Sequence, residues 1–166
     1  MNVVDLSSLL LDDLVTKAGD SVRKRQHCNV HSSQDDPVQR LFNAIELNSY
    51  IRPHRHSQDP KTETLIGIRG AFTFITFDDF GEIIRMIEFG AQGGGKPVIS
   101  AGVEVPPEIW HTIVANEPGS VLFEVKAGPF YSSKAKEWAP WAPSEDSEAR
   151  HAYLASLRHR IRCSYK

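Results

Sequence analysis

Three histidines and one glutamate in this sequence have the types and spacing of a metal site. His54 and His56 are two residues apart, so in a strand both imidazoles project to the same side. Glu63 opens the next apolar segment, and a loop over 57–62 would return its carboxylate to the histidines. His111 lies in a further β segment. Three imidazoles and one carboxylate suit zinc, iron, nickel, copper or manganese, so we expect one divalent transition metal here.

Two residues before the histidines share their strand parity. If the strand stays regular, Tyr50 and Arg52 face the same cavity as His54 and His56. An arginine in that position binds a carboxylate or phosphate in bidentate fashion. The structural alternative is that Tyr50 packs in the core and Arg52 covers the mouth of the barrel.

A second polar face is predicted near the N-terminus. In the segment 21–31, Arg25, His27 and Asn29 alternate, which indicates an extended strand that shows these side chains on one side. Such a face binds an anionic sugar, supplies an acid and a base, or is simply solvated. Arg40 lies between this face and the histidines in sequence and is a further substrate-binding candidate.

Glu124 and Lys126 alternate on one face of the last barrel strand, while apolar residues occupy the other. They form either an exposed ion pair or part of the cavity rim. The catalytic candidates are therefore Tyr50, His27 and Glu124. The substrate-binding candidates are Arg25, Asn29, Arg40, Arg52 and Lys126.

Short segments rich in Ile, Val, Phe and Thr, separated by turn residues, occupy residues 41–127. Their spacing of roughly 8–12 residues predicts an all-β sandwich or barrel. Ala71–Phe77 and Glu82–Phe89 are predicted to form a hairpin. The glycine run 93–95 is expected to be a turn between strands.

The two ends of the chain differ from this pattern. Residues 5–18 predict a helix, residues 145–161 predict another, and Asp36-Pro37 predicts a short helical turn. The first helix is expected to bury Leu6, Leu9, Leu10 and Leu14, and the second Ala149, Ala152, Tyr153, Leu157 and Ile161. The proline-rich run 138–143 predicts an extended tail over the barrel, where Trp138 and Trp141 either fix the tail or stack on a sugar ring.

The composition fits one globular domain. The 166 residues include 40% hydrophobic and 24% charged residues, and the formal charge is −2, which argues against a dedicated nucleic-acid binder. No apolar stretch approaches the ~20 residues of a membrane span. No basic cluster precedes the first apolar run, so the cytoplasm is the expected compartment.

The metal candidates also resemble the two motifs of the cupin superfamily. Pro53-His54-Arg55-His56 with Glu63 and Gly70 resembles the first motif, and 105–111 with Asn116 resembles the second. The gap before Glu63 is longer than usual, and Glu108 stands where glycine is common. The resemblance covers roughly residues 41–127 and implies a single cupin barrel (a double-stranded β-helix, or jelly roll). We expect this barrel to extend over residues 21–130, between an N-terminal helix in 1–20 and a tail with a C-terminal helix in 131–166.

A narrower resemblance spans nearly the whole chain. Residues 31–40, 50–56, 123–129 and 137–143 look like those of the WbuC family. Those proteins are bacterial cupin-fold metalloproteins, some of them associated with O-antigen and other surface-polysaccharide gene clusters, with no settled activity. The resemblance implies a fold and a metal but no reaction.

Several functions are compatible with such a site. The first is a metal-dependent isomerase or epimerase acting on a small sugar, sugar phosphate or other anionic substrate, and an iron form would instead act as a dioxygenase. The second is a binding module without turnover. The third is a structural metal, which the lack of nearby cysteine disfavours. Exposed edge strands predict a homodimer, and no nucleic-acid or membrane partner is expected.

Overall fold

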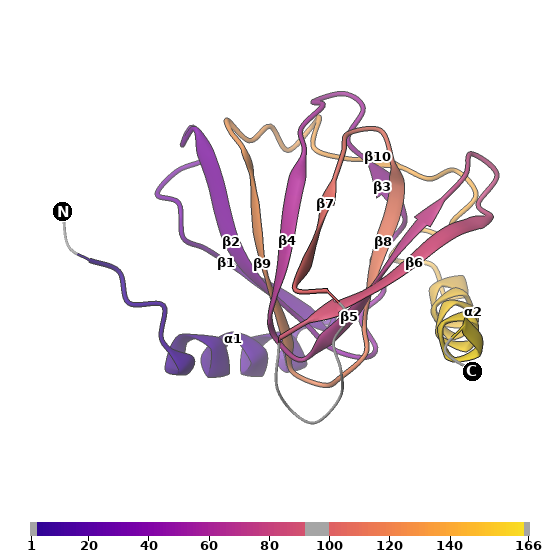
Figure 1. Cartoon of the computed structure of the whole chain (residues 1–166), viewed down its shortest axis with the longest axis horizontal. Coiled ribbons are helices and arrows are strands. Elements are labelled where there is room, and N and C mark those ends of the chain that lie inside the picture. Colours follow the sequence, from indigo (N-terminus) through magenta and orange to yellow (C-terminus); the bar gives the residue numbers. More distant parts are fainter. Residues whose placement is uncertain (1–2, 92–99, 165–166) are drawn as a thin grey trace.

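The computed structural model describes residues 3–91 and 100–164, which form two antiparallel sheets flanked by two helices (Figure 1). In chain order, the elements of this part are α1 (Ser8–Asp20), β1 (Arg25–Asn29), β2 (Val38–Ile45), β3 (His54–Arg55), β4 (Glu63–Arg69), β5 (Ala71–Phe77), β6 (Ile83–Gly90), β7 (Gly102–Val105), β8 (Trp110–Ala115), β9 (Ser120–Ala127), β10 (Glu137–Trp138) and α2 (Ala149–Ser164).

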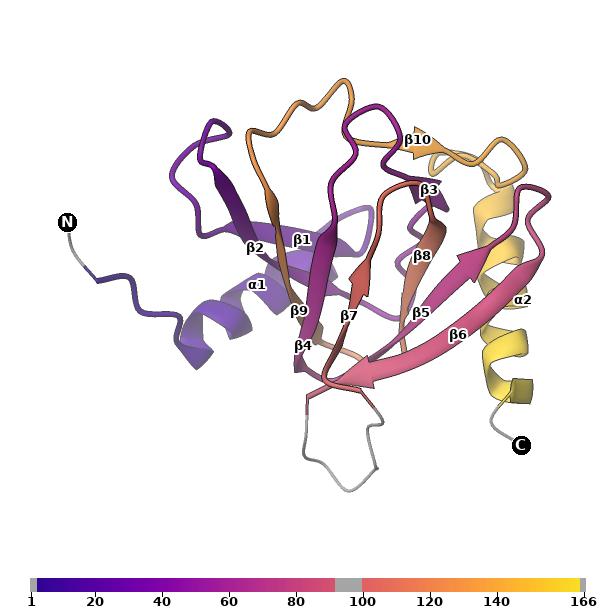
Figure 2. The same ribbon diagram turned by 45° about the horizontal axis from the view of Figure 1, so that its top comes forward.

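The two sheets face each other as a sandwich (Figure 2). The first has the strand order β1-β2-β9-β4-β7, and the second has the order β10-β3-β8-β5-β6. Most neighbouring strands are distant in sequence, as in a jelly roll. The predicted all-β barrel with a helix at each end is therefore confirmed.

Apolar side chains fill three layers. The space between the sheets holds Ile45, Ile51, Leu65, Phe72, Phe74, Phe89, Val105, Ala115 and Leu122. α1 covers the outer side of the first sheet, where it packs on β1, β2 and β9. α2 and the tail cover the second sheet through Leu154, Leu157 and Ile161. Because the helices and the tail cover the outer surfaces of the sandwich, the polar candidate site residues lie at one end of it and in the tail.

The helices differ from their predicted faces. α1 starts after Ser7, whose hydroxyl oxygen accepts a hydrogen bond from the Leu10 amide, and ends at Asp20 rather than 18. It buries Leu11, Leu14 and Ala18, whereas Leu6 and Leu9 are exposed. α2 begins at Ala149 rather than 145, and its buried residues are Leu154, Leu157 and Ile161. α1 can form either of two overlapping apolar faces from Leu9, Leu10, Leu11 and Leu14, and the face that contacts the first sheet is the one that is buried.

The predicted hairpin is confirmed as β5 and β6. Asp78 shapes its turn, because one carboxylate oxygen accepts hydrogen bonds from the amides of Phe80 and Glu82. The helical turn predicted at Asp36-Pro37 is wrong. Asp36 instead accepts a hydrogen bond from the amide of Val38 two residues on, and this local turn leads directly into β2.

The strand predicted over 21–31 is shorter, Arg25–Asn29, and pairs with β2. The glycine turn predicted at 93–95 lies outside the described residues. Neither helix in the described part is long and apolar enough to cross a membrane.

Candidate metal centre and the cavity beside it

Strand pairing brings the three histidines together. In the second sheet, His54 of β3 lies directly opposite His111 of β8. His56 follows β3 by one residue and keeps the parity of His54. One ring nitrogen from each histidine lies within 4.8 Å of the other two, and all three side chains are buried. The three imidazoles could therefore hold one metal ion.

Backbone carbonyls determine which nitrogen of each ring is free. The Nδ1 atoms of His54, His56 and His111 lie 2.9, 2.5 and 2.8 Å from the carbonyl oxygens of Arg52, Ala135 and Ile109. In a neutral imidazole each Nδ1–H then donates to its carbonyl, which leaves the lone pair on Nε2. Hydrogen bonding to the backbone thus prepares three ligand atoms at once.

Glu63 adds a carboxylate to the group. It opens β4, and its Oε2 lies 3.0 Å from His56 Nε2 and 4.0 Å from His111 Nε2. His56 Nε2 is buried without a hydrogen bond, so its lone pair faces a carboxylate oxygen. A cation between the two atoms relieves that repulsion. The donor set and this buried nitrogen fit a divalent transition metal.

Burial and charge place these groups in their ligand forms. Burial lowers the pKa of His54, and lowers the pKa of His111 to about 4, so both rings are neutral near pH 7. Burial acts to raise the pKa of Glu63, but the positive charge of Lys126 opposes it, and the pKa lies well below its usual range. Lys126 Nζ lies 2.8 Å from Glu63 Oε1. Glu63 is therefore a carboxylate.

A cavity of about 550 Å³ lies beside the centre, between β1, β2, β9 and the tail. That volume is within the range of small-molecule sites. A much smaller pocket touches His56 and Glu63, and the two share Lys126, Phe130 and Ala135. These three residues form the partition between the buried centre and the cavity.

Five of the predicted site residues line this cavity. They are Arg25, His27 and Asn29 from β1, and Glu124 and Lys126 from β9. Glu124 and Lys126 form an ion pair of 2.6 Å that lines the cavity, and because their side chains are only 15% and 13% exposed, the alternative of an exposed surface pair is wrong. Arg25 is engaged as well, because its Nη2 lies 2.5 Å from Glu145 Oε2 in the tail.

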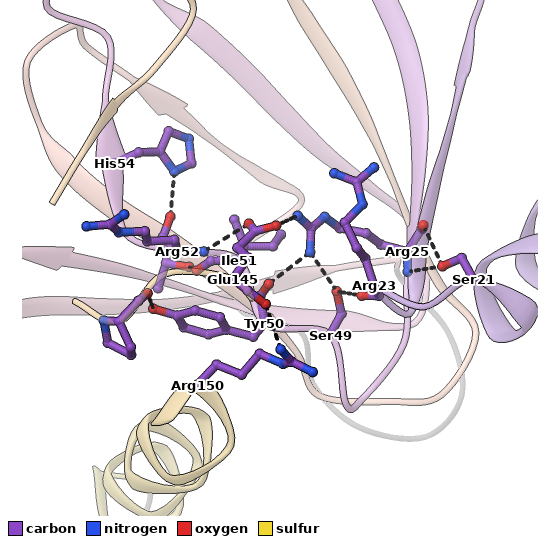
Figure 3. Close-up of polar contacts among 12 residues, drawn as sticks. Ser21, Arg23, Arg25, Ser49, Tyr50, Ile51, Arg52, His54, Glu145 and Arg150 are labelled. Atoms are coloured by element: carbon purple, nitrogen blue, oxygen red, sulfur yellow. Dashed lines mark hydrogen bonds and ion pairs between the residues drawn. The ribbon is translucent and has the colours of Figure 1, made fainter. Parts of the chain in front are cut away.

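Tyr50 does not share the cavity, and that expectation is wrong. The strand is regular only from His54 onward, so the parity argument fails for residues before it. The Tyr50 ring packs in the core against Tyr153, and its hydroxyl donates to the carbonyl of Pro143 (Figure 3). Burial raises the pKa of Tyr50, which makes this phenol a poor base.

Arg52 and Arg40 also lie away from the cavity walls. Arg52 Nη2 donates to the carbonyl of Ala139, and its backbone amide donates to Glu145 (Figure 3). Arg52 therefore ties the tail to the barrel. Arg40 pairs with Asp36 at 3.2 Å, beside the turn into β2.

The tail holds one cavity residue that sequence reasoning missed, Lys136, and one that it considered, Trp138. Lys136 lines the cavity from the tail. The pKa values of His54 and His111 are lowered mainly by burial, and the positive charge of Lys136 lowers them further. Trp138 of β10 is paired with His54, is 43% exposed and also lines the cavity. Trp141 instead packs on Phe77 in the core. Lys136 and Trp138 are two residues apart in an extended segment, and this alternation could have indicated that both face the cavity.

Comparison with solved structures shows the same fold at low identity. Protein SO0799 from Shewanella oneidensis is 12% identical, with a TM-score of 0.54 over 76% of this chain and 82% of that chain. Oxalate decarboxylase from Bacillus subtilis is 15% identical, with a TM-score of 0.50 over 69% of this chain and 27% of that chain. A cupin 2 domain-containing protein from Halorhodospira halophila is 14% identical, with a TM-score of 0.47 over 83% and 81%.

Such identities establish the fold alone. No curated protein matches the sequence. A family model does match residues 6–89, which is half of the chain, and it is described as a domain of unknown function (DUF6016). The chain therefore belongs to the DUF6016 family, and its two five-stranded sheets share the fold of protein SO0799 and oxalate decarboxylase.

Proposed function

We propose that this protein is a metal-dependent enzyme acting on a small sugar-type or anionic substrate. Only the sugar-type substrate is taken from the resemblance to the WbuC family, some of whose members are associated with surface-polysaccharide gene clusters. One observation carries the proposal: three Nε2 atoms and the Glu63 carboxylate converge at a centre that only Lys126, Phe130 and Ala135 separate from a polar cavity of about 550 Å³. A structural ion alone explains the convergence. It does not explain a neighbouring cavity of ligand size.

The metal would be held by His54, His56, Glu63 and His111. When bound there, a divalent ion supplies a Lewis acid for a carbonyl or phosphoryl oxygen. The histidines are pre-oriented by backbone carbonyls, which reduces the reorganisation needed to bind it. Phe130 and Ala135 lie between the centre and the cavity, so they limit the access of water.

An isomerisation or epimerisation needs a base that takes a proton from carbon and returns it. Glu124 fits this role by position, because its carboxylate faces the cavity and is held by Lys126 at 2.6 Å. His27 faces the same cavity from β1. Tyr50 is withdrawn from the role because its hydroxyl donates to Pro143 in the core.

A binding module without turnover is the second candidate, and Trp138 is the observation that favours it. This side chain is 43% exposed and lines the cavity, where an aromatic face can stack on a sugar ring. A module of this kind would bind sugars with the metal present and convert none of them.

The test starts with elemental analysis of protein purified without added metal. Metal-loaded and chelator-treated samples are then screened with sugar phosphates, nucleotide sugars and oxygen uptake. We expect about one ion per chain and conversion of at least one sugar-type or anionic substrate, by the loaded sample only. Binding without conversion supports the module, and equal turnover by both samples contradicts the proposal.

A further inference from the structure

The cavity carries an uneven distribution of charge. Two of its cations are neutralised in place: Arg25 by Glu145 at 2.5 Å, and Lys126 by Glu124 and Glu63 at 2.6 and 2.8 Å. Among the described residues, Lys136 Nζ has no carboxylate oxygen within 4.0 Å. Arg23 also lines the cavity without an ion pair to any described residue, but it is the charge of Lys136 that acts on His54 and His111 of the centre.

The location of this ammonium is set by the tail. Ala135, the residue before it, gives its carbonyl to His56, and β10 just after it pairs with β3. The tail is thus attached to the metal centre on both sides of Lys136. Lys136 Nζ lies 5.4 Å from the ring centre of Trp138, and both side chains line the cavity.

The local environment of Lys136 favours an anion. Lys136 is an exposed residue that lines the cavity, and desolvation of its ammonium lowers its pKa despite the attraction of Glu63 and Glu124. An ammonium without a carboxylate partner gains from a bound carboxylate or phosphate. The apolar lining is sparse, comprising Leu41, Phe130, Ala135 and Trp138, so the remainder of the ligand should be polar.

We propose that Lys136 binds the acid group of a small sugar-type ligand, beside the three histidines, while Trp138 packs against the sugar ring. This inference rests on the proposed function only in taking the cavity as the substrate site. It narrows the substrate class to sugars that carry a carboxylate or a phosphate. Lys136 is a binding residue, and no proton transfer is assigned to it.

The experiment uses the full chain with and without zinc, and measures binding by titration calorimetry. The probes are glucuronate, glucose 6-phosphate and neutral glucose. The variants are Lys136→Gln, which removes the charge, and Lys136→Arg, which keeps it. The matched control is Lys134→Gln, because Lys134 lies two residues earlier in the tail, is exposed and points to Tyr131 rather than the cavity.

We expect wild type to bind at least one acid sugar at least about tenfold more tightly than glucose. Loss of a charged hydrogen bond predicts a further roughly 10- to 100-fold weakening in Lys136→Gln, with near wild-type affinity in Lys136→Arg and Lys134→Gln. The tighter of the two acid probes identifies the acid group. Zinc content should be equal in all variants.

The proposal is overturned if neither acid sugar binds better than glucose, or if Lys136→Gln binds them as wild type does. Its failure is distinct from that of the proposed function. Lys136-dependent binding in a protein that retains no metal leaves this inference standing and removes the metal enzyme. If the protein holds one metal ion per chain but binds acid sugars independently of Lys136, the proposed function stands and this inference falls.

Discussion

The metal centre and the cavity beside it are built in opposite ways. The centre consists of buried side chains from paired strands, and each histidine is oriented by a backbone carbonyl. The cavity is built from strands β1, β2 and β9 and the tail, and several of its side chains, such as His27 and Asn29, are exposed. The difference indicates that the first region is preformed for one ion, whereas the second can vary with the ligand.

Removing a histidine of the centre should have the largest effect. His111→Ala deletes a ligand and leaves a buried gap, and we expect zinc affinity to fall on the order of 1,000-fold, since even the loss of an outer hydrogen-bond partner costs about 10- to 100-fold. His27→Ala, in the cavity, should keep the wild-type affinity. Competition with a chromophoric chelator measures both, and equal losses would remove the distinction between the regions.

The tail links the two regions, and Glu137 is one of its anchors. Its carboxylate accepts two hydrogen bonds of 2.9 Å from Arg55 and another from Ser57, close to the Ala135 carbonyl that orients His56. Glu137→Gln should therefore weaken zinc binding by about tenfold.

Amide exchange over residues 135–139 should increase in Glu137→Gln. The control is Glu148→Gln, whose side chain is 91% exposed. If Glu137→Gln shows faster exchange in the tail but binds zinc as tightly as wild type, the centre does not depend on the tail.

Acid should loosen the same anchor. The hydrogen bonds from Arg55, and then from Ser57, lower the pKa of Glu137 below its usual 4.5. Its contribution is complete above pH 4.5 and is lost as the pH falls through the lower folded-state pKa. For a partly exposed pair this amounts to no more than about 1 kcal/mol. The rate of proteolysis of the tail, measured as a function of pH, tests this. Wild type should be cleaved more slowly than Glu137→Gln above pH 4.5, and the two rates should become equal in acid.

The smallest effect is expected at the cavity wall. Asn29 is exposed, so Asn29→Ala should change the free energy of unfolding by less than about 0.5 kcal/mol and leave zinc affinity unchanged. Urea unfolding checks the first expectation. A large loss of stability would show that the cavity wall is as tightly integrated as the centre.

The sequence predicted the centre better than the cavity, for physical reasons. His54, His56 and Glu63 are close in sequence, and the period of a strand brings the two histidines to one side. The all-β fold followed from short apolar segments and their turns. Two predictions failed because they depended on tertiary partners that no local pattern contains. Asp36 forms a turn into β2 in place of a helical turn, and α1 buries a different face from the one expected.

The cavity depended on such long-range contacts throughout. Tyr50 was misplaced because regular strand geometry stops short of it, and Lys136 was missed because the tail returns across the second sheet. Arg25 reaches Glu145, 120 residues away in sequence, and only the folded chain reveals that pair.

The central claim is that three imidazoles from His54, His56 and His111 share one metal ion with Glu63. X-ray absorption spectroscopy of the zinc-loaded protein tests it most directly. We predict the multiple-scattering pattern of three imidazoles, with nitrogen at roughly 2.0–2.1 Å and oxygen completing the shell. A shell that contains sulfur, or fewer than three imidazoles, would contradict the account.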